Sequence, residues 1–245
     1  MRHDHRIENE IKHGAFIAKQ GEQIWNWSSP AGRKRWKRRC DLFAEFLGNK
    51  SQNVLEVGCG TGLFTAELVK ANNKIIAIDV SKDLIEIAQK RVGDKVSFLL
   101  RDAGKTSFPD NYFDFIVGSS ILHHLDAGPA IKEFYRILKP GGKFMFTEPN
   151  MLNPQIFLQK NIPFIKKLAG DSPDETAFFR WSIKKKLLIA GFGNVAAIPF
   201  DFMHPATPGF LLGYLERGFY LLEKIPLIRE FAGSLIISGV KLIIK

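Results

Sequence analysis

The fold is decided by residues 54–62, which read Val-Leu-Glu-Val-Gly-Cys-Gly-Thr-Gly. A short apolar strand, Asn53–Val57, runs into glycines at alternate positions, and a helical pattern begins directly behind them. Glycine lets the backbone turn sharply and lets a ligand lie against it, while the start of a helix offers unpaired N–H groups. The stretch therefore predicts a strand, a loop and a helix with a ligand site at the carboxyl end of the strand.

The next strand, predicted over Lys74–Ile78, ends in an acidic residue. Asp79 follows Gly62 by 17 positions, where a carboxylate can accept hydrogen bonds from both ribose hydroxyls of a nucleoside. The dinucleotide fingerprint requires a glycine at the place of Leu63, and the Gly-Lys-Ser/Thr of a phosphate-binding loop is missing. These residues indicate a nucleoside cofactor other than NAD or ATP.

Strand and helix patterns alternate along most of the remaining chain. Strands separated by helices require crossover connections, which produce a mostly parallel sheet with helices on both faces. We therefore expect an α/β fold, a doubly wound, mostly parallel seven-stranded sheet with a helical N-terminal extension and helical insertions after the fifth and sixth strands. The predicted strands are Asn53–Val57, Lys74–Ile78, Val96–Leu100, Phe113–Val117, Lys143–Thr147, Asn194–Phe202 and Ser234–Ile244.

Helix boundaries are marked by capping residues. Ser29-Pro30 and Ser81 have the residue types that begin helices, the pattern behind the glycine loop predicts a helix over Leu63–Ala71, and Pro140-Gly141-Gly142 is expected to end one. In the first of these helices an apolar stripe packs on the core and leaves the basic residues of 33–39 largely outside. The stripe consists of Trp36, Cys40, Phe43 and Leu47.

The pattern Glu-x-Gly-x-Gly-x-Gly at residues 56–62 resembles the first motif of the class I S-adenosylmethionine-dependent methyltransferases, small-molecule type. Further motifs match in the same order at Asp79, Asp102-Ala103, Asp114–Val117 and Leu138–Lys143, so the resemblance covers residues 53–149. It implies a Rossmann-like methyltransferase fold with S-adenosylmethionine as cofactor. The cofactor contacts that it implies come from Glu56, Gly58, Cys59, Gly60, Gly62, Asp79, Val80, Asp102, Ala103 and Ser119.

In this family the segments on either side of the core cover the methyl acceptor. We accordingly expect one domain overall, in which residues 1–50 form a helical extension or lid and residues 51–149 the cofactor-binding core. Residues 150–245 are expected to supply the acceptor lid and the C-terminal part of the same sheet. The substrate-binding residues expected in the flanks are Trp27, Arg33 and His204.

The candidate catalytic residues are His123 and His124, a few positions beyond the fourth strand. The sulfonium of the cofactor already activates the methyl group, so the protein mainly aligns an in-line displacement and excludes water. A hydroxyl acceptor also benefits from a base with a pKa of about 7, for which histidine is suited. A histidine pair is equally typical of packing at a helix start. No metal is expected, because the sequence shows no acidic cluster of the kind that binds magnesium.

Charge and cysteine content limit the cellular setting. The net charge is +10, and its excess lies in the flanks: residues 1–50 hold 11 Lys and Arg against 6 Asp and Glu, and residues 151–245 hold 12 against 7. The two cysteines exclude a disulfide framework and a four-cysteine zinc site. Without a visible secretory signal or an uninterrupted apolar run of about 18 residues, we expect a cytoplasmic protein that could rest on an anionic membrane.

The acceptor is expected to be an apolar or lipid-like small molecule. Twenty-one phenylalanines, many of them outside the core, are typical of an apolar pocket. The apolar stretch Gly209–Phe231 suits a membrane interface, a buried helical hairpin or an oligomer face, and the sequence leaves the oligomeric state open. The basic cluster Arg33–Arg39 suits lipid head groups, a phosphorylated or pyrophosphorylated acceptor, or RNA. The alternative is therefore an RNA methyltransferase, although no RNA-binding module is recognisable. A nucleoside-binding scaffold without activity is a third hypothesis.

Overall fold

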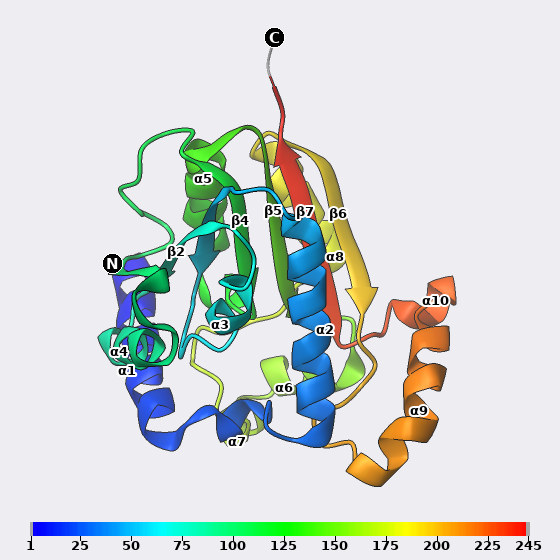
Figure 1. Cartoon of the computed structure of the whole chain (residues 1–245). Helices are drawn as coiled ribbons and strands as arrows, with labels where there is room; N and C mark the ends of the chain where they lie inside the picture. The colour runs from blue at the N-terminus through cyan, green and yellow to red at the C-terminus, as the bar shows by residue number, and fades with distance from the viewer. Residues whose placement is uncertain (1, 244–245) are drawn as a thin grey trace.

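The computed structural model describes residues 2–243, which form a seven-stranded sheet with helices on both faces (Figure 1). The strand order is β3-β2-β1-β4-β5-β7-β6, and β7 alone runs antiparallel to its neighbours in this sheet. The expected doubly wound, mostly parallel fold is confirmed. The strands are β1 (Asn53–Val57), β2 (Lys74–Asp79), β3 (Ser97–Leu100), β4 (Phe113–Ser119), β5 (Leu138–Pro149), β6 (Phe192–Phe200) and β7 (Ser234–Lys241).

The helices cover the two faces of the sheet and close its lower edge (Figure 1). On one face lie α2 (Pro30–Leu47), α3 (Thr65–Leu68) and α4 (Lys82–Val92), and on the other lie α5 (Ala127–Ile137) and α8 (Arg180–Ile189). The remaining helical segments are α1 (Arg2–Gln20), η1 (Glu22–Trp25), η2 (Gly93–Lys95), η3 (Leu122–His124), α6 (Pro154–Asn161), α7 (Pro163–Leu168), α9 (Gly209–Leu222) and α10 (Pro226–Arg229).

The core consists of two apolar layers, one on each side of the sheet. Alternate residues of β4 divide between them, because successive side chains of a strand point to opposite faces. Phe115 and Val117 pack with Phe43 of α2, whereas Ile116 packs with Phe134 of α5. The period of two in this strand therefore lets helices bury both faces of the sheet.

Several local predictions can be compared with the structure directly. Ser29 and Ser81 cap α2 and α4, because their hydroxyls accept hydrogen bonds from the backbone N–H groups three residues ahead. The predicted helix Leu63–Ala71 is reduced to α3. The Pro140-Gly141-Gly142 turn lies inside β5, which already begins at Leu138, so the strand prediction started too late. The last strand ends at Lys241, and the predicted end at Ile244 lies outside the described residues.

The stretch Gly209–Phe231 forms α9 and α10 rather than a buried hairpin. Helix α9 packs against α2, and among its residues the structure buries Leu212. Phe210 and Tyr214 are 78% and 85% exposed. In the part of the chain that the structure describes, we find no helix with the length and apolarity needed to cross a membrane.

Candidate active site

A cavity of about 460 Å³ opens at the carboxyl ends of the parallel strands, the edge at which α6, α7 and η1 lie in Figure 1. Its wall on the sheet side comes from the glycine loop, the end of β2 and the segment after β4. The opposite wall comes from α1, α2, the α6–α7 region and the segment after β6. One cavity thus joins the central unit to both flanks.

The glycine loop approaches the cavity through backbone conformations that only glycine adopts readily. Gly58, Gly60 and Gly62 have φ angles of 67°, 52° and 77°, in the left-handed region. A Cβ on Gly58 would lie 2.2 Å from the Ile121 side chain. Gly58, Cys59 and Gly60 line the cavity, while Gly62 lies outside its lining and packs against α4.

Asp79 fixes the glycine loop to the end of β2. Its Oδ2 accepts a hydrogen bond from the Gly60 N–H at 2.9 Å, and its Oδ1 accepts one from the Ser81 N–H at 2.9 Å. Burial raises the pKa of this carboxyl, against the effect of these backbone donors. Asp79 and Val80 both line the cavity, so the carboxylate is placed where a nucleoside sugar can meet it.

Glu56 lies beneath the loop, outside the residues that line the cavity. Its side chain is buried, and its Oε2 has no hydrogen-bond partner among the described residues. Burial raises the pKa of Glu56 to about 8. A protonated carboxyl group can serve here as a structural support of the loop.

The predicted cofactor residues after β3 and at the end of β4 divide between the wall and its surroundings. Ala103 and Ser119 line the cavity, and so does Arg101, which the sequence reasoning missed. Asp102 lies outside the lining and accepts a hydrogen bond from the Gly104 N–H at 2.8 Å.

His123 is buried between two carboxylates. Its Nδ1 lies 2.6 Å from Glu148 Oε2, and its Nε2 lies 3.3 Å from Glu175 Oε1. Glu148 also accepts hydrogen bonds from the backbone N–H groups of residues 121–123. Burial by itself would lower the pKa of His123, but Glu148 and Glu175 raise it to about 9. The imidazole is therefore protonated at neutral pH.

His124 is oriented by the N-terminal helix. Its Nδ1 lies 2.8 Å from Glu10 Oε2, and its ring stacks on His13 at a centroid distance of 5.9 Å. Glu10 also accepts a hydrogen bond from the Ser172 hydroxyl at 2.6 Å. Helix α1 therefore fixes both the second histidine and the loop after α7, and all three of His13, His123 and His124 line the cavity. Nothing in the sequence pattern signals this link across more than a hundred residues.

The group His123, His124 and Glu175 has one ligand-type atom from each residue, and these atoms lie within 4.8 Å of one another, close enough to hold a metal ion. Glu175 is already paired with the ammonium of Lys160, which also lies 2.8 Å from Asp171. Because a cation and an imidazolium already neutralise this carboxylate, the described geometry fits a proton-handling cluster better than a metal centre.

Of the three predicted substrate residues, Trp27 and His204 line the cavity. Arg33 is exposed, lies outside the lining and donates to the Ser28 carbonyl at the start of its own helix. Successive residues of a helix are turned by about 100°, so Arg33 does not share the direction of Arg35 and Arg39, which do line the cavity. The sequence signal that could have placed Arg35 and Arg39 in the wall is their spacing of four residues, next to the apolar stripe of the same helix.

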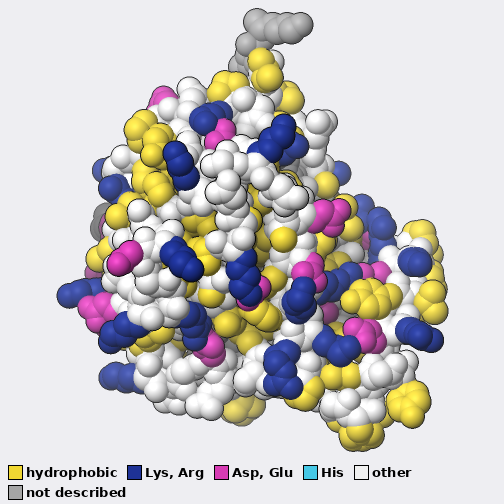
Figure 2. Space-filling model, in the orientation of Figure 1, with side chains coloured by type: hydrophobic (Ala, Val, Ile, Leu, Met, Phe, Trp, Pro, Cys, Tyr) yellow, Lys and Arg dark blue, Asp and Glu magenta, His cyan; other side chains and the backbone are white. Residues whose placement is uncertain are grey.

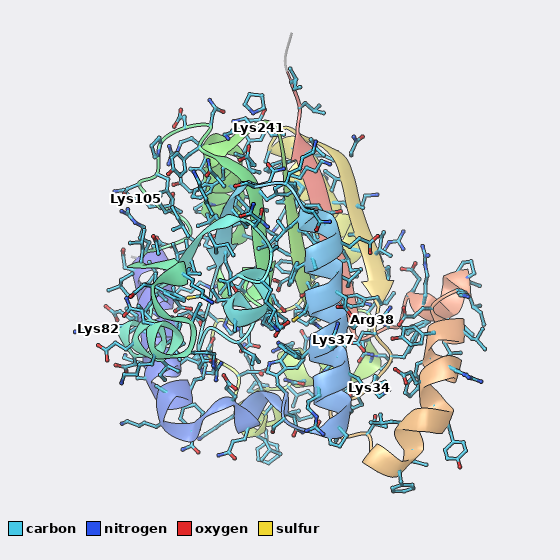
Figure 3. The ribbon with its side chains drawn as sticks, viewed as in Figure 1. Lys34, Lys37, Arg38, Lys82, Lys105 and Lys241 are labelled. Carbon is cyan, nitrogen blue, oxygen red and sulfur yellow. The ribbon has the colours of Figure 1, made fainter. Side chains whose placement is uncertain are left out.

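The basic cluster of α2 is not a free positive surface. Figure 3 shows Lys34 and Arg38 on the side of α2 that faces α9, where they pair with Glu216 and Glu223. The expectation that the cluster lies largely outside was wrong for Arg39, whose side chain is 3% exposed. Arg39 is buried because it pairs with the buried carboxylate of Asp201. The other pairs are Lys37 with Asp41, Arg35 with Asp201, and Arg39 with Asp201.

Comparisons with known proteins agree with this geometry. A family model described as a methyltransferase domain matches residues 55–146. Demethylmenaquinone methyltransferase of Staphylococcus aureus (strain JH9) is 27% identical over 238 residues, which cover 87% of this chain and 97% of that protein.

Solved structures share the fold. A SAM-dependent methyltransferase from Thermotoga maritima has a TM-score of 0.65 and 21% identity, covering 94% of this chain and 99% of that one. The N-methyltransferase NodS from Bradyrhizobium japonicum, in complex with S-adenosyl-L-homocysteine, has a TM-score of 0.64 and 18% identity, covering 95% and 98%. The chain thus contains a methyltransferase domain, and it has the fold of the class I S-adenosylmethionine-dependent methyltransferases.

Proposed function

We propose that this methyltransferase moves the methyl group of S-adenosylmethionine, by in-line displacement, to a small apolar or lipid-like acceptor. The observation that carries the proposal is the single cavity that joins the glycine loop and Asp79 to a wall built from the flanks. In this proposal residues 51–149 hold the cofactor, and residues 1–50 and 150–245 cover the acceptor. The name of the demethylmenaquinone relative supports an apolar, quinone-like acceptor.

The cofactor is proposed to lie along the glycine loop, with its ribose at Asp79. Gly58, Cys59 and Gly60 offer backbone in close approach, and Asp79 offers a carboxylate for the sugar hydroxyls. Glu56 and Gly62 support the loop from outside the cavity. Val80, Ala103 and Ser119 line the cavity and remain proposed contacts of the adenosyl group, whereas Asp102, outside the lining, is proposed to hold the turn after β3.

His124 is the residue that we propose as the general base. Glu10 holds its Nδ1, which leaves Nε2 to accept a proton from an acceptor hydroxyl. His123 has both ring nitrogens on carboxylates and a pKa of about 9, so it enters as a cation. Because its two carboxylate partners already neutralise that charge, we assign His123 to positioning the segment that carries His124.

The RNA alternative loses its main support, because five residues of the basic cluster on α2 are paired with carboxylates. Membrane contact is instead proposed for α7 and α9. Phe164 and Leu168 of α7 are 76% and 78% exposed beside Lys166 and Lys167, and Figure 2 shows hydrophobic side chains over α9 at the lower right. Apolar side chains next to lysines suit an anionic membrane surface.

A liposome experiment tests this contact. The variant Phe210→Ser/Tyr214→Ser should sediment less with vesicles of phosphatidylglycerol and phosphatidylcholine than the wild type. Leu188→Ser, which changes an exposed apolar residue on α8, serves as the matched control. Equal sedimentation of all three proteins would exclude a membrane contact through α9.

The acceptor is tested by methyl transfer from labelled S-adenosylmethionine. Demethylmenaquinone in detergent is the first probe, followed by lipid and RNA fractions of a cell extract. We expect label in the probe or in the apolar lipid fraction, and a strongly reduced turnover in His124→Gln with the KM for the cofactor unchanged. Label in RNA alone, or in no fraction, would contradict the proposal.

A further inference from the structure

Two arginines on the inner face of α2 share one oxygen of a buried carboxylate. Arg35 Nε and Arg39 Nη1 lie 2.8 and 2.9 Å from Asp201 Oδ2. The side chains of Arg35, Arg39 and Asp201 are only 14%, 3% and 2% exposed, and all three residues line the cavity. The pair therefore belongs to the wall of the cavity and not to the outer surface.

The charges around Asp201 do not balance. Its second oxygen accepts a hydrogen bond from the Met203 N–H at 3.3 Å. The nearby Glu223 is occupied by both terminal nitrogens of Arg38 at 2.6 Å and by the Asp201 N–H. Three guanidinium groups thus face two carboxylates, which leaves one positive charge in excess beside the cavity.

The excess positive charge has donors to offer. Arg39 Nε is buried and has no hydrogen-bond partner among the described residues. The Arg35 side chain donates one hydrogen bond in the part of the chain that the structure describes, from Nε to Asp201. Burial lowers the pKa of Arg39 to about 10, against the opposing effect of Asp201. Burial, followed by the charge of Arg35, lowers the pKa of His204 in the same wall. An anion bound there would relieve this repulsion.

The two guanidinium groups are held in place. Trp27 lies under both, with ring-to-guanidinium distances of 5.6 and 5.5 Å, and Arg39 Nη2 donates to the Ser234 hydroxyl at 2.7 Å. Asp201 has a φ angle of 73°, a left-handed conformation that is uncommon for residues other than glycine. Strained backbone of this kind is often found at ligand sites.

We propose that Arg35 and Arg39 form a subsite for an anionic oxygen group, a carboxylate or a phosphate, carried by the methyl acceptor. Guanidinium groups bind both anions through paired hydrogen bonds. This inference rests on the proposed function and makes the acceptor amphipathic: an apolar body with one acidic group. The sheet order supports the assignment to the acceptor, because Asp201 follows β6 and Arg39 contacts Ser234 at the start of β7, whereas the glycine loop follows β1 in the other half of the sheet.

The test uses the full chain, saturated with S-adenosylhomocysteine. Inorganic phosphate is the probe that is added to it. Phosphate, compared with chloride at equal ionic strength, should raise the melting temperature of the wild type. In Arg35→Gln the apparent affinity for phosphate should fall at least about tenfold, as expected for loss of a charged hydrogen-bond donor, and Arg35→Lys should restore part of it. Arg39 still pairs with Asp201 in these variants, so the fold is expected to persist.

Lys37→Gln is the matched control, because it removes the same charge from the outer side of the same helix, where Lys37 pairs with Asp41. It should respond to phosphate as the wild type does. An equal phosphate response in Arg35→Gln would overturn the subsite. An equally large loss of S-adenosylhomocysteine affinity in Arg35→Gln would assign the anion to the amino-acid tail of the cofactor and overturn the assignment to the acceptor. Either result leaves methyl transfer to apolar molecules intact, whereas failure of the wild type to bind S-adenosylhomocysteine would refute the proposed function itself.

Discussion

The two halves of the cavity are built in different ways. On the side that we propose for the cofactor, the geometry comes from backbone conformation within a short stretch: glycines at positive φ and one carboxylate that accepts two backbone hydrogen bonds. On the side that we propose for the acceptor, it comes from buried ion pairs between segments that are far apart in sequence. Arg35 and Asp201 are 166 positions apart, and His124 and Glu10 are 114 apart.

Because of this difference, we expect substitutions in the two halves of the cavity to change different properties of the protein. A buried ion pair that loses one partner leaves an uncompensated charge, which destabilises the whole fold. A glycine or carboxylate at the edge of the cavity mainly shapes a ligand site. We therefore expect substitutions on the acceptor side to change stability and its pH dependence, and substitutions on the cofactor side to change cofactor affinity more than stability.

The largest effect is expected for Arg39→Met. It removes the buried hydrogen bonds that Arg39 donates to Asp201, to the Ser234 hydroxyl and to the Arg35 carbonyl, so the free energy of unfolding should fall by about 3–4 kcal/mol. Urea denaturation measures the change, with Lys37→Met as the exposed control at less than about 0.5 kcal/mol. A change below about 1 kcal/mol would mean that this half does not depend on the ion pair.

The pH dependence of stability should report His123. Its pKa of about 9 in the folded protein lies above the unfolded value of 6.5, so its charge stabilises the fold fully below pH 6.5 and this contribution disappears as pH rises through 9. The difference corresponds to about 3 kcal/mol. Denaturation of the wild type and His123→Gln between pH 6 and 9.5 should therefore converge with rising pH. Parallel curves would show that Glu148 and Glu175 do not hold a charged imidazole.

Sequence reasoning reached most of the fold and the local geometry of the glycine loop and Asp79, where we propose that the cofactor binds. The glycine loop and Asp79 are local patterns whose meaning does not depend on distant residues, and the serine caps are equally local. The acceptor half was not accessible in this way. Asp201 was predicted to lie inside a strand, and nothing near it indicates that two arginines of α2 converge on its carboxylate. Glu10 gave no signal either, because an acidic residue on an amphipathic helix is ordinary.

A glycine comparison tests the cofactor half. In Gly58→Ala the new Cβ would meet Ile121 at 2.2 Å and the residue would keep a φ of 67°, so the loop must shift. We expect S-adenosylhomocysteine affinity to fall by about 2 kcal/mol, which is roughly thirtyfold. Gly93→Ala is the control: it has a φ of 72° with open space around the Cβ, so it should lose stability by about 1–2 kcal/mol while keeping its cofactor affinity. If calorimetry showed that the two variants lose the same affinity for S-adenosylhomocysteine, backbone strain alone would explain the loss, and the position of Gly58 at the cavity would not matter.

The smallest effect is expected for Asp79→Asn. The amide keeps one oxygen for the Ser81 N–H but loses the negative charge that favours bonds from the Gly60 N–H and from ribose hydroxyls. Because a hydrogen bond to a charged group contributes about 1.5 kcal/mol, the affinity for S-adenosylhomocysteine should fall about tenfold, with little change in the free energy of unfolding. Asp83→Asn, an exposed acidic residue at the start of α4, should leave both quantities unchanged. If Asp79→Asn lowered stability as much as Arg39→Met while cofactor affinity stayed constant, the carboxylate would be a structural anchor of the kind found in the acceptor half, and the contrast between the two halves would no longer hold.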